Sequence, residues 1–250
     1  MREERFATPH PIRVECSVTA GDITITTAEG GESGVTLDGP QELVDAMRVE
    51  LVGDRLVISE PRSSILDLVT RGRDSLALVA SVPHHSGVLV KTASSDAALD
   101  GTFGEIEMQS ASADLRVTGE VDGDITVKSA SGDVLLPRVR GHVDVRGVSG
   151  DLHAESVDGS VTVTLVSGDV RIDCLREGTV SVRSVSGDVE LGIAPGSDVD
   201  LDASSASGDL VSELPLSDSP GAGSNPTVVI RGVTASGDFR VFRAVHAPLA

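Results

Sequence analysis

One short motif carries the side chains in this chain that could do chemistry. Ser-Gly-Asp, once as Ser-Ala-Asp, occurs seven times, with its aspartates at Asp114, Asp133, Asp151, Asp169, Asp188, Asp209 and Asp238. Carboxylates bind hard cations such as Ca²⁺, and a serine hydroxyl beside a base can act as a nucleophile. The motif is therefore either a row of sites or a repeated structural device.

The spacing of the aspartates indicates which elements position them. The first five are 19, 18, 18 and 19 residues apart, and the last two steps are 21 and 29 residues. A fixed period of this kind is typical of a solenoid, in which each repeat is one coil stacked on the next. Aligned corners would place the carboxylates about 5 Å apart along one edge.

Each coil contains two short runs that alternate between apolar and polar residues, as strands with one buried face do. The first begins after the aspartate, and the second follows a glycine such as Gly123, Gly141 or Gly159. The sequence predicts an all-β fold, a parallel β-solenoid (β-roll or β-helix) of about 18–19-residue coils with two strands each. Pro40 and the apolar residues after it predict one short helix near residues 40–47, with Leu43, Ala46 and Met47 on one face.

The aspartates are better explained as turn residues than as metal ligands. Each is expected to accept hydrogen bonds from backbone N–H groups of its own corner, while glycine supplies a positive φ. Ca²⁺-binding β-rolls repeat a nine-residue unit at both corners. The second corner of this chain does not repeat such a ligand set. Its residues in successive coils are Glu105, Asp124, His142, Ser160, Thr179 and Asp198. Seven equivalent serines are also unlike an active site, so we predict no catalytic, cofactor or metal site.

Three further groups of residues carry expectations. The small residue before each corner, such as Val148 or Val166, is expected to plug the corner from inside. His142 and His153 are expected on the solvated surface, and the His84-His85 loop could touch a ligand. One outward column consists of Lys128, Arg146, Thr164 and Arg183, flanked by Gln109 and Asp202. Beside it runs an acidic and hydroxyl column of Asp144, Thr162, Ser181 and Asp200. Such a face is more simply a solvated sheet with compensating charges; docking of a partner is the alternative.

The periodicity also divides the chain. Residues 1–92 are expected to form a β-rich cap continuous with the solenoid, with an irregular excursion at 61–73. Residues 93–250 form the repeat region, with a Pro- and Gly-rich loop at 214–226 and a C-terminal cap from residue 227.

Composition limits the classes of function. With 20 basic and 39 acidic residues, the net charge of −19 argues against nucleic acid and anionic membranes as partners. Four Phe and no Trp or Tyr leave a core of aliphatic residues and few groups for stacking on sugars. Cys16 and Cys174 are expected to be reduced, half-buried thiols. Neither a signal peptide nor a spanning helix is evident, so a cytoplasmic location is predicted.

The strand-Ala-Gly-Asp-Ile-strand opening, the Pro-His-His-Ser-Gly stretch leading into Thr-Ala-Ser-Ser-Asp, and the repeated Ser-Gly-Asp units resemble a known family. It is the bacterial "putative adhesin" β-strand-repeat family of unknown function, also described as toastrack-like, and the resemblance covers roughly residues 12–243. It implies a β-solenoid without known catalysis, in relatives often linked to envelope-stress regulators. It carries no functional residues over to this chain.

The sequence thus predicts a non-enzymatic β-solenoid scaffold or protein-interaction module, in an envelope-stress or regulatory complex, with a protein partner. One alternative is a Ca²⁺-binding adhesive β-roll, in which the aspartate row holds the cation. The other is a polysaccharide-acting β-helix enzyme, which would need an acidic cluster in a cleft and sugar-stacking aromatic residues.

Overall fold

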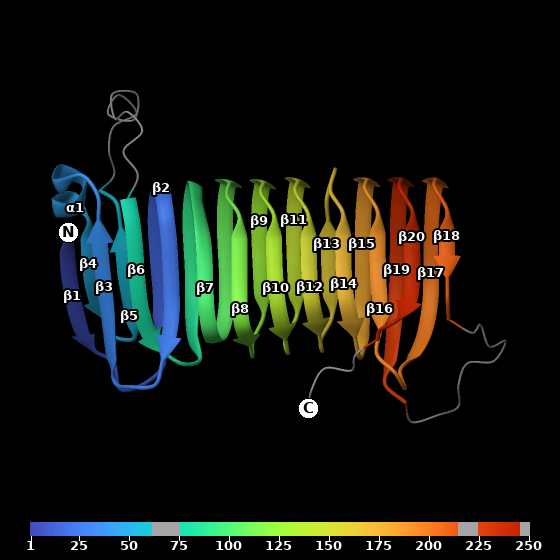
Figure 1. The fold of residues 1–250 in the computed structure, drawn as a ribbon, viewed down its shortest axis with the longest axis horizontal. Coiled ribbons are helices and arrows are strands. Elements are labelled where there is room, and N and C mark those ends of the chain that lie inside the picture. The colour runs from blue at the N-terminus through green and yellow to red at the C-terminus, as the bar shows by residue number, and fades with distance from the viewer. Residues whose placement is uncertain (62–75, 215–224, 246–250) are drawn as a thin grey trace. The chain divides into compact units, whose positions relative to one another are not determined.

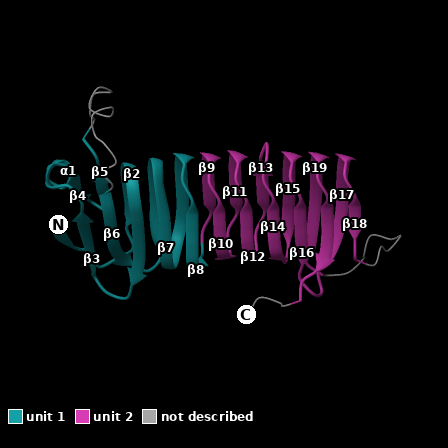
Figure 2. Ribbon diagram, turned by 45° about the horizontal axis from the view of Figure 1, so that its top comes forward, with its two compact units in different colours: residues 1–122 teal, residues 123–250 magenta. Residues whose placement is uncertain are grey.

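The computed structural model describes residues 1–61, 76–214 and 225–245. It confirms the predicted fold class, since the described chain is almost entirely β-strand with one short helix (Figure 1). The chain divides into two compact units, residues 1–122 and 123–250 (Figure 2). The expected boundary near residue 92 stays a prediction; strand β7 runs through that position without a break.

Unit 1 is built around strand β2, which has paired strands along both of its edges. Its elements are β1 (Arg2–Ala7), β2 (Arg13–Ala28), β3 (Glu32–Asp38), α1 (Gln41–Ala46), β4 (Arg48–Val52), β5 (Arg55–Ser59), β6 (Leu76–Pro83), β7 (Ser86–Ser112) and β8 (Leu115–Val121). Strand β2 pairs in parallel with β7 along one edge and with β5 and then β6 along the other. Strand β8 continues the parallel series on β7.

Antiparallel strands complete unit 1. Strand β3 pairs antiparallel with both β1 and β6, and β4 forms a hairpin with β5 at the predicted Gly53 turn. Helix α1 lies where the sequence predicts it, but it buries Val44, and Met47 just after its end, while Ala46 is exposed. The predicted excursion at 61–73 lies, apart from residue 61, outside the described residues.

The described part of unit 2 consists of six coils of two strands each. The first arms are β10 (Val134–Val139), β12 (Leu152–Val157), β14 (Val170–Leu175), β16 (Val189–Ile193), β18 (Leu210–Ser212) and β20 (Phe239–Arg243). The second arms are β9 (Ile125–Ser131), β11 (Val143–Ser149), β13 (Val161–Thr164), β15 (Gly178–Ser186), β17 (Asp198–Ser207) and β19 (Thr227–Ser236). Parallel pairing places equivalent residues of successive coils next to one another. One buried column, for example, contains Ile125, Val143, Val161 and Val180.

The last coil in the sequence is not the last coil of the stack. Strand β19 pairs with both β15 and β17, and β20 pairs with both β16 and β18 (Figure 1). The sequence predicts a C-terminal cap from residue 227, but residues 227–243 lie between two other coils. The end coil of the described unit is β17 with β18. Residues 215–224 of the predicted loop lie outside the description.

Packing explains why the bulky end of the chain fits inside the stack. Phe239 is 2% exposed, and its ring occupies the space that a side chain on Gly232 would need. A Cβ atom at Gly232 would stand 2.3 Å from the Phe239 ring. The aromatic residue therefore belongs to the aliphatic core, because a glycine in the facing arm makes room for it.

Candidate functional site

The aspartates of the Ser-Gly-Asp corners hold successive coils together. In unit 2, the backbone N–H of each corner aspartate after Asp133 donates a hydrogen bond of 2.8–2.9 Å to the Oδ1 atom of the aspartate in the neighbouring coil. The resulting series, called the aspartate ladder below, runs through Asp133, Asp151, Asp169, Asp188, Asp238 and Asp209 in that spatial order. The predicted turn role is thus corrected in its detail, because the acceptor serves the next coil and not its own corner.

Glycine is required at these corners for two reasons. Gly168 has φ +133°, a conformation that residues with a side chain rarely adopt. A Cβ atom there would also stand 2.1 Å from the carbonyl oxygen of Gly150 in the neighbouring coil. The glycine thus lets the backbones approach, and the aspartate then bridges them.

Unit 1 contains the same device, which the sequence analysis missed. The N–H of Asp114 donates to Oδ1 of Asp96 at 2.9 Å, and Asp96 pairs in register with Asp22. Ser94-Ser95-Asp96 lacks the glycine of the motif, and Ala20-Gly21-Asp22 lacks the serine. The 18-residue step from Asp96 to Asp114 was the signal that could have found the first of these corners.

The second corner uses the same principle with mixed side chains. The N–H of His142 donates to Oδ1 of Asp124 at 2.8 Å, and the N–H of Ser160 donates to Nδ1 of His142 at 3.0 Å. The N–H of Thr179 in turn donates to Oγ of Ser160 at 3.1 Å. His142 is exposed, as expected, but it has a defined role as a hydrogen-bond acceptor between coils. That role requires the tautomer with an unprotonated Nδ1.

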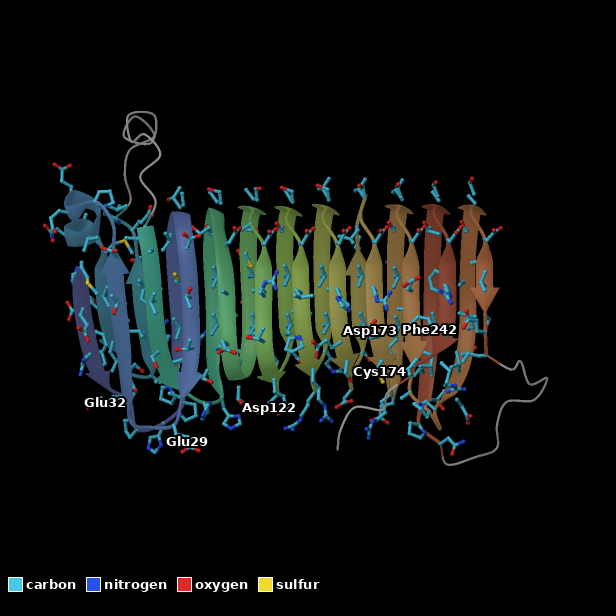
Figure 3. All side chains as sticks on the ribbon, viewed as in Figure 1. Glu29, Glu32, Asp122, Asp173, Cys174 and Phe242 are labelled. Carbon is cyan, nitrogen blue, oxygen red and sulfur yellow. The ribbon has the colours of Figure 1, made fainter. Side chains whose placement is uncertain are left out.

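The His84-His85 turn between β6 and β7 has defined contacts in unit 1. Nδ1 of His84 lies 2.8 Å from Oγ1 of Thr27, and Nδ1 of His85 lies 2.6 Å from a carboxylate oxygen of Asp122 (Figure 3). His85 has φ +63°, the one positive φ of a non-glycine residue in the described chain. The adjacent Ser86 hydroxyl is fully buried and donates to the Pro83 carbonyl, so it is not placed as a nucleophile for this pair.

The outer face of the first arms in unit 2 carries a network of paired charges. Asp173 accepts hydrogen bonds of 2.8 Å from His153 and from Arg171, and Arg171 also bonds Glu190 at 2.8 Å (Figure 3). Arg240 continues the network to Glu213. Partial burial raises the pKa of Asp173, but the hydrogen bonds from His153 and Arg171 outweigh it and leave that pKa below its ordinary value. His153 is therefore hydrogen-bonded to a carboxylate and not simply solvated.

The outer face of the second arms has a different character. The residue before each corner, predicted to point inward, points outward instead: Val148, Val166 and Val185 are 54, 47 and 53% exposed. The predicted basic column is present as Lys128, Arg146, Thr164 and Arg183, but it continues with Val233 and Ser204 and not with Asp202. Asp202 is displaced into the neighbouring column, where it pairs with Arg231 at 3.2 Å, and Asp200 lies opposite Val229.

The metal-ligating side chains and the two cysteines in the described part of the chain are dispersed. No group of three or more His, Cys, Asp or Glu side chains within it converges on a position that could hold a metal ion. Cys16 and Cys174 are both free and both buried, 1 and 5% exposed, more deeply than expected. Burial raises the pKa of the Cys16 thiol to about 12, which disfavours the reactive thiolate. No helix in the described ranges is long and apolar enough to span a bilayer.

Comparison with protein families identifies the architecture. The profile of a family described as Toastrack DUF4097 matches residues 12–241, nearly the whole chain. The chain belongs to the Toastrack DUF4097 family. The resemblance inferred from the corner motifs is thereby confirmed.

Solved structures are similar to this chain at low sequence identity. A "putative adhesin" from Bacteroides fragilis has a TM-score of 0.51 and 16% identity, with 96% of each chain covered. A "putative adhesin" and a "putative lipid binding protein" from Parabacteroides distasonis have TM-scores of 0.48 and 0.30, with 11 and 10% identity and 96% of each chain covered. At these identities the likeness concerns the fold alone. Comparison with the curated proteins found no match.

Proposed function

We propose that this Toastrack chain is a non-enzymatic β-solenoid scaffold that binds a protein partner in an envelope-stress or regulatory complex. The observation that carries the proposal is the use of the corner side chains. The aspartates, His142 and Ser160 are the residues whose types could do chemistry, and they accept hydrogen bonds between coils. The polar groups at the corners thus stabilise the stacking of the coils. The outward-facing side chains of the strands are the ones left to contact a partner.

The two outer faces of unit 2 differ in how they could serve such a partner. On the first-arm face, Arg171 and Arg240 are neutralised by neighbouring carboxylates. On the second-arm face, Arg146 is paired with Asp144 and Arg231 with Asp202. Lys128 and Arg183, however, form no ion pair with the described residues, and three valines are about half exposed. Exposed apolar surface with unpaired charge is what interaction sites present. The second-arm face is therefore the expected docking surface.

Site-specific photo-crosslinking in cells that produce the chain tests this proposal. A photoreactive phenylalanine analogue replaces Thr164, which is exposed on the second-arm strand β13. Glu155, exposed on the first-arm strand β12, is the matched control position. We expect light-dependent protein adducts from position 164 and few from position 155. Two inert positions would contradict the proposal, and stronger adducts from position 155 would place docking on the other face.

A further inference from the structure

Three outward valines form a continuous apolar line on unit 2. Val148, Val166 and Val185 occupy equivalent positions, because the serines that follow them pair as Ser149–Ser167 and Ser167–Ser186. Backbone hydrogen bonds from Ser167 to Val148 and from Ser186 to Val166 fix the same alignment. Parallel strands stack about 4.8 Å apart, so the side chains form an unbroken ridge. We call this line the valine stripe; Ala130, Ala235 and Ala206 extend it at its ends.

Opposite charges border the valine stripe on its two sides. Two residues before the stripe lies the basic column, with Lys128, Arg146 and Arg183. Three residues after it, past the glycine, lies the aspartate ladder, with Asp133, Asp151, Asp169 and Asp188 all exposed. Across the strands, the order is therefore the basic column, in which Arg146 is also paired with Asp144, then the valine stripe, and then the negative ladder at the corner where the strands end. The ladder carboxylates lie close to one another, and a row of cations placed against them would relieve their repulsion.

We propose that the partner on this face is a second copy of this chain, in a two-fold dimer whose axis runs parallel to the stacking direction of the coils. The proposal rests on the proposed function, which makes the second-arm face a docking surface. Rotation about such an axis places each valine stripe on the other. It also places each basic column against the partner copy's aspartate ladder. An axis perpendicular to the stacking direction, in the plane of the face, would set basic column against basic column.

The available area suits a reversible dimer. Six second-arm strands span about 29 Å at 4.8 Å per strand, and about six residues along each strand, every second one facing outward, span about 20 Å. Roughly 600 Å² would be buried on each copy, about 1,200 Å² in total, which is the lower end for specific interfaces. The dimer is therefore expected to dissociate on dilution and to weaken with salt, because its charged columns are exposed to solvent.

Sedimentation equilibrium of the purified full chain tests for the dimer. We expect concentration-dependent dimerisation that weakens at high salt, and at least a tenfold rise in Kd for Val166→Asp. Val79→Asp is the matched control, because Val79 is also 47% exposed but lies on β6 of unit 1. Val79→Asp should leave Kd unchanged, and thermal unfolding checks that both variants fold. A monomer at every concentration overturns the proposal, and so does an equal effect of both substitutions.

The charged columns are tested without disturbing the ladder. The double substitution Asp151→Asn with Asp169→Asn keeps an Oδ1 acceptor at each corner but removes two charges. We expect a severalfold higher Kd and a weaker salt dependence. Unchanged dimerisation in this variant would overturn the role assigned to the ladder.

Single cysteines distinguish the two possible orientations. With the axis parallel to the stack, each stripe residue meets its own copy, so Val148→Cys, Val166→Cys and Val185→Cys should each form a disulfide-linked dimer. With the perpendicular axis, at most one of the three positions meets itself, and that pattern overturns the proposal. A monomeric purified chain whose position 164 still crosslinks to a different protein would overturn the dimer and leave the proposed function standing.

Discussion

An aspartate, a histidine and a serine play the same part at successive second corners of unit 2. Asp124, His142 and Ser160 each accept a hydrogen bond from the backbone of the neighbouring coil. These side chains differ in charge and size but share an acceptor atom near the turn. The corner therefore requires an acceptor, not a carboxylate. The Ser-Gly-Asp corners therefore resemble a row of metal ligands and the second corners do not, although the side chains of both series accept a backbone hydrogen bond from the neighbouring coil.

The aspartate ladder should respond to loss of the acceptor and not to loss of the charge. In Asp151→Ala, the N–H of Asp169 loses its 2.8 Å bond, and we expect the free energy of unfolding to fall by about 1 kcal/mol. Asp151→Asn keeps the acceptor and should change that free energy by less. Urea unfolding of both variants measures the difference. Equal losses in the two variants would show that the charge matters more than the hydrogen bond.

Asp173 should make stability depend on pH in acid. Because its folded pKa is depressed, its contribution is complete above the ordinary carboxyl pKa of about 3.9. It is lost as pH falls through the lower folded value. The stability difference between the native chain and Asp173→Asn should be fully present at pH 5 and should shrink below pH 4. Urea unfolding across this range measures it; a difference that persists undiminished at pH 2.5 contradicts the assignment.

At the scale of elements, the coils depend on a close approach of backbones at each glycine corner. Gly168→Ala combines a strained positive φ with a contact of 2.1 Å to Gly150. We expect a loss of at least about 2 kcal/mol in unfolding free energy. Gly196→Ala is the control, because Gly196 has φ +87° but nothing within 4 Å of the added Cβ. It should lose only about 1 kcal/mol. Similar losses of unfolding free energy in the two variants would show that the contact with Gly150 does not contribute.

The inserted coil makes a prediction about neighbours. Ser236 pairs with both Ser186 and Ser207, so Ser186 and Ser207 stand two strands apart, about 9.6 Å. Under mild oxidation, Ser186→Cys with Ser236→Cys should form a disulfide, and so should Ser207→Cys with Ser236→Cys. Ser186→Cys with Ser207→Cys should not, because a disulfide needs Cα atoms within about 7 Å. Mass spectrometry of the digests reads the result. A bond between positions 186 and 207 would indicate coils stacked in chain order.

The sequence predicted the coils and their two arms because period and alternation are local signals. It could not predict the order of the last two coils, since Ser207-Gly208-Asp209 and Ser236-Gly237-Asp238 fit equally well beside Ser186. What favours the observed order is packing between coils that are distant in the sequence, such as Phe242 of the inserted coil beside Gly192 of β16. The outward valines could have been predicted: Asp144, Arg146 and Val148 keep one period-2 phase, and only the apolar character of Val148 suggested the interior.

For the whole molecule, the net charge of −19 raises the question of bound cations. The ladder geometry accounts for one oxygen of each aspartate that accepts a backbone N–H. We therefore expect the melting temperature to be the same with millimolar Ca²⁺ as with chelator, and Mg²⁺ at equal ionic strength controls for screening. A rise specific to Ca²⁺ would support the adhesive β-roll and count against the ladder as a purely structural device.

The coil inserted out of order also bears on how the protein is made. Repeat proteins can usually grow by adding each new coil to the one before it as the chain leaves the ribosome. Here β17 and β18 emerge before β19 and β20, the strands on which they stack. The β17–β18 coil cannot form its native strand pairing until residues 227–243 have been synthesised. The last two coils are therefore synthesised in one order and stacked on the preceding coil in the opposite order.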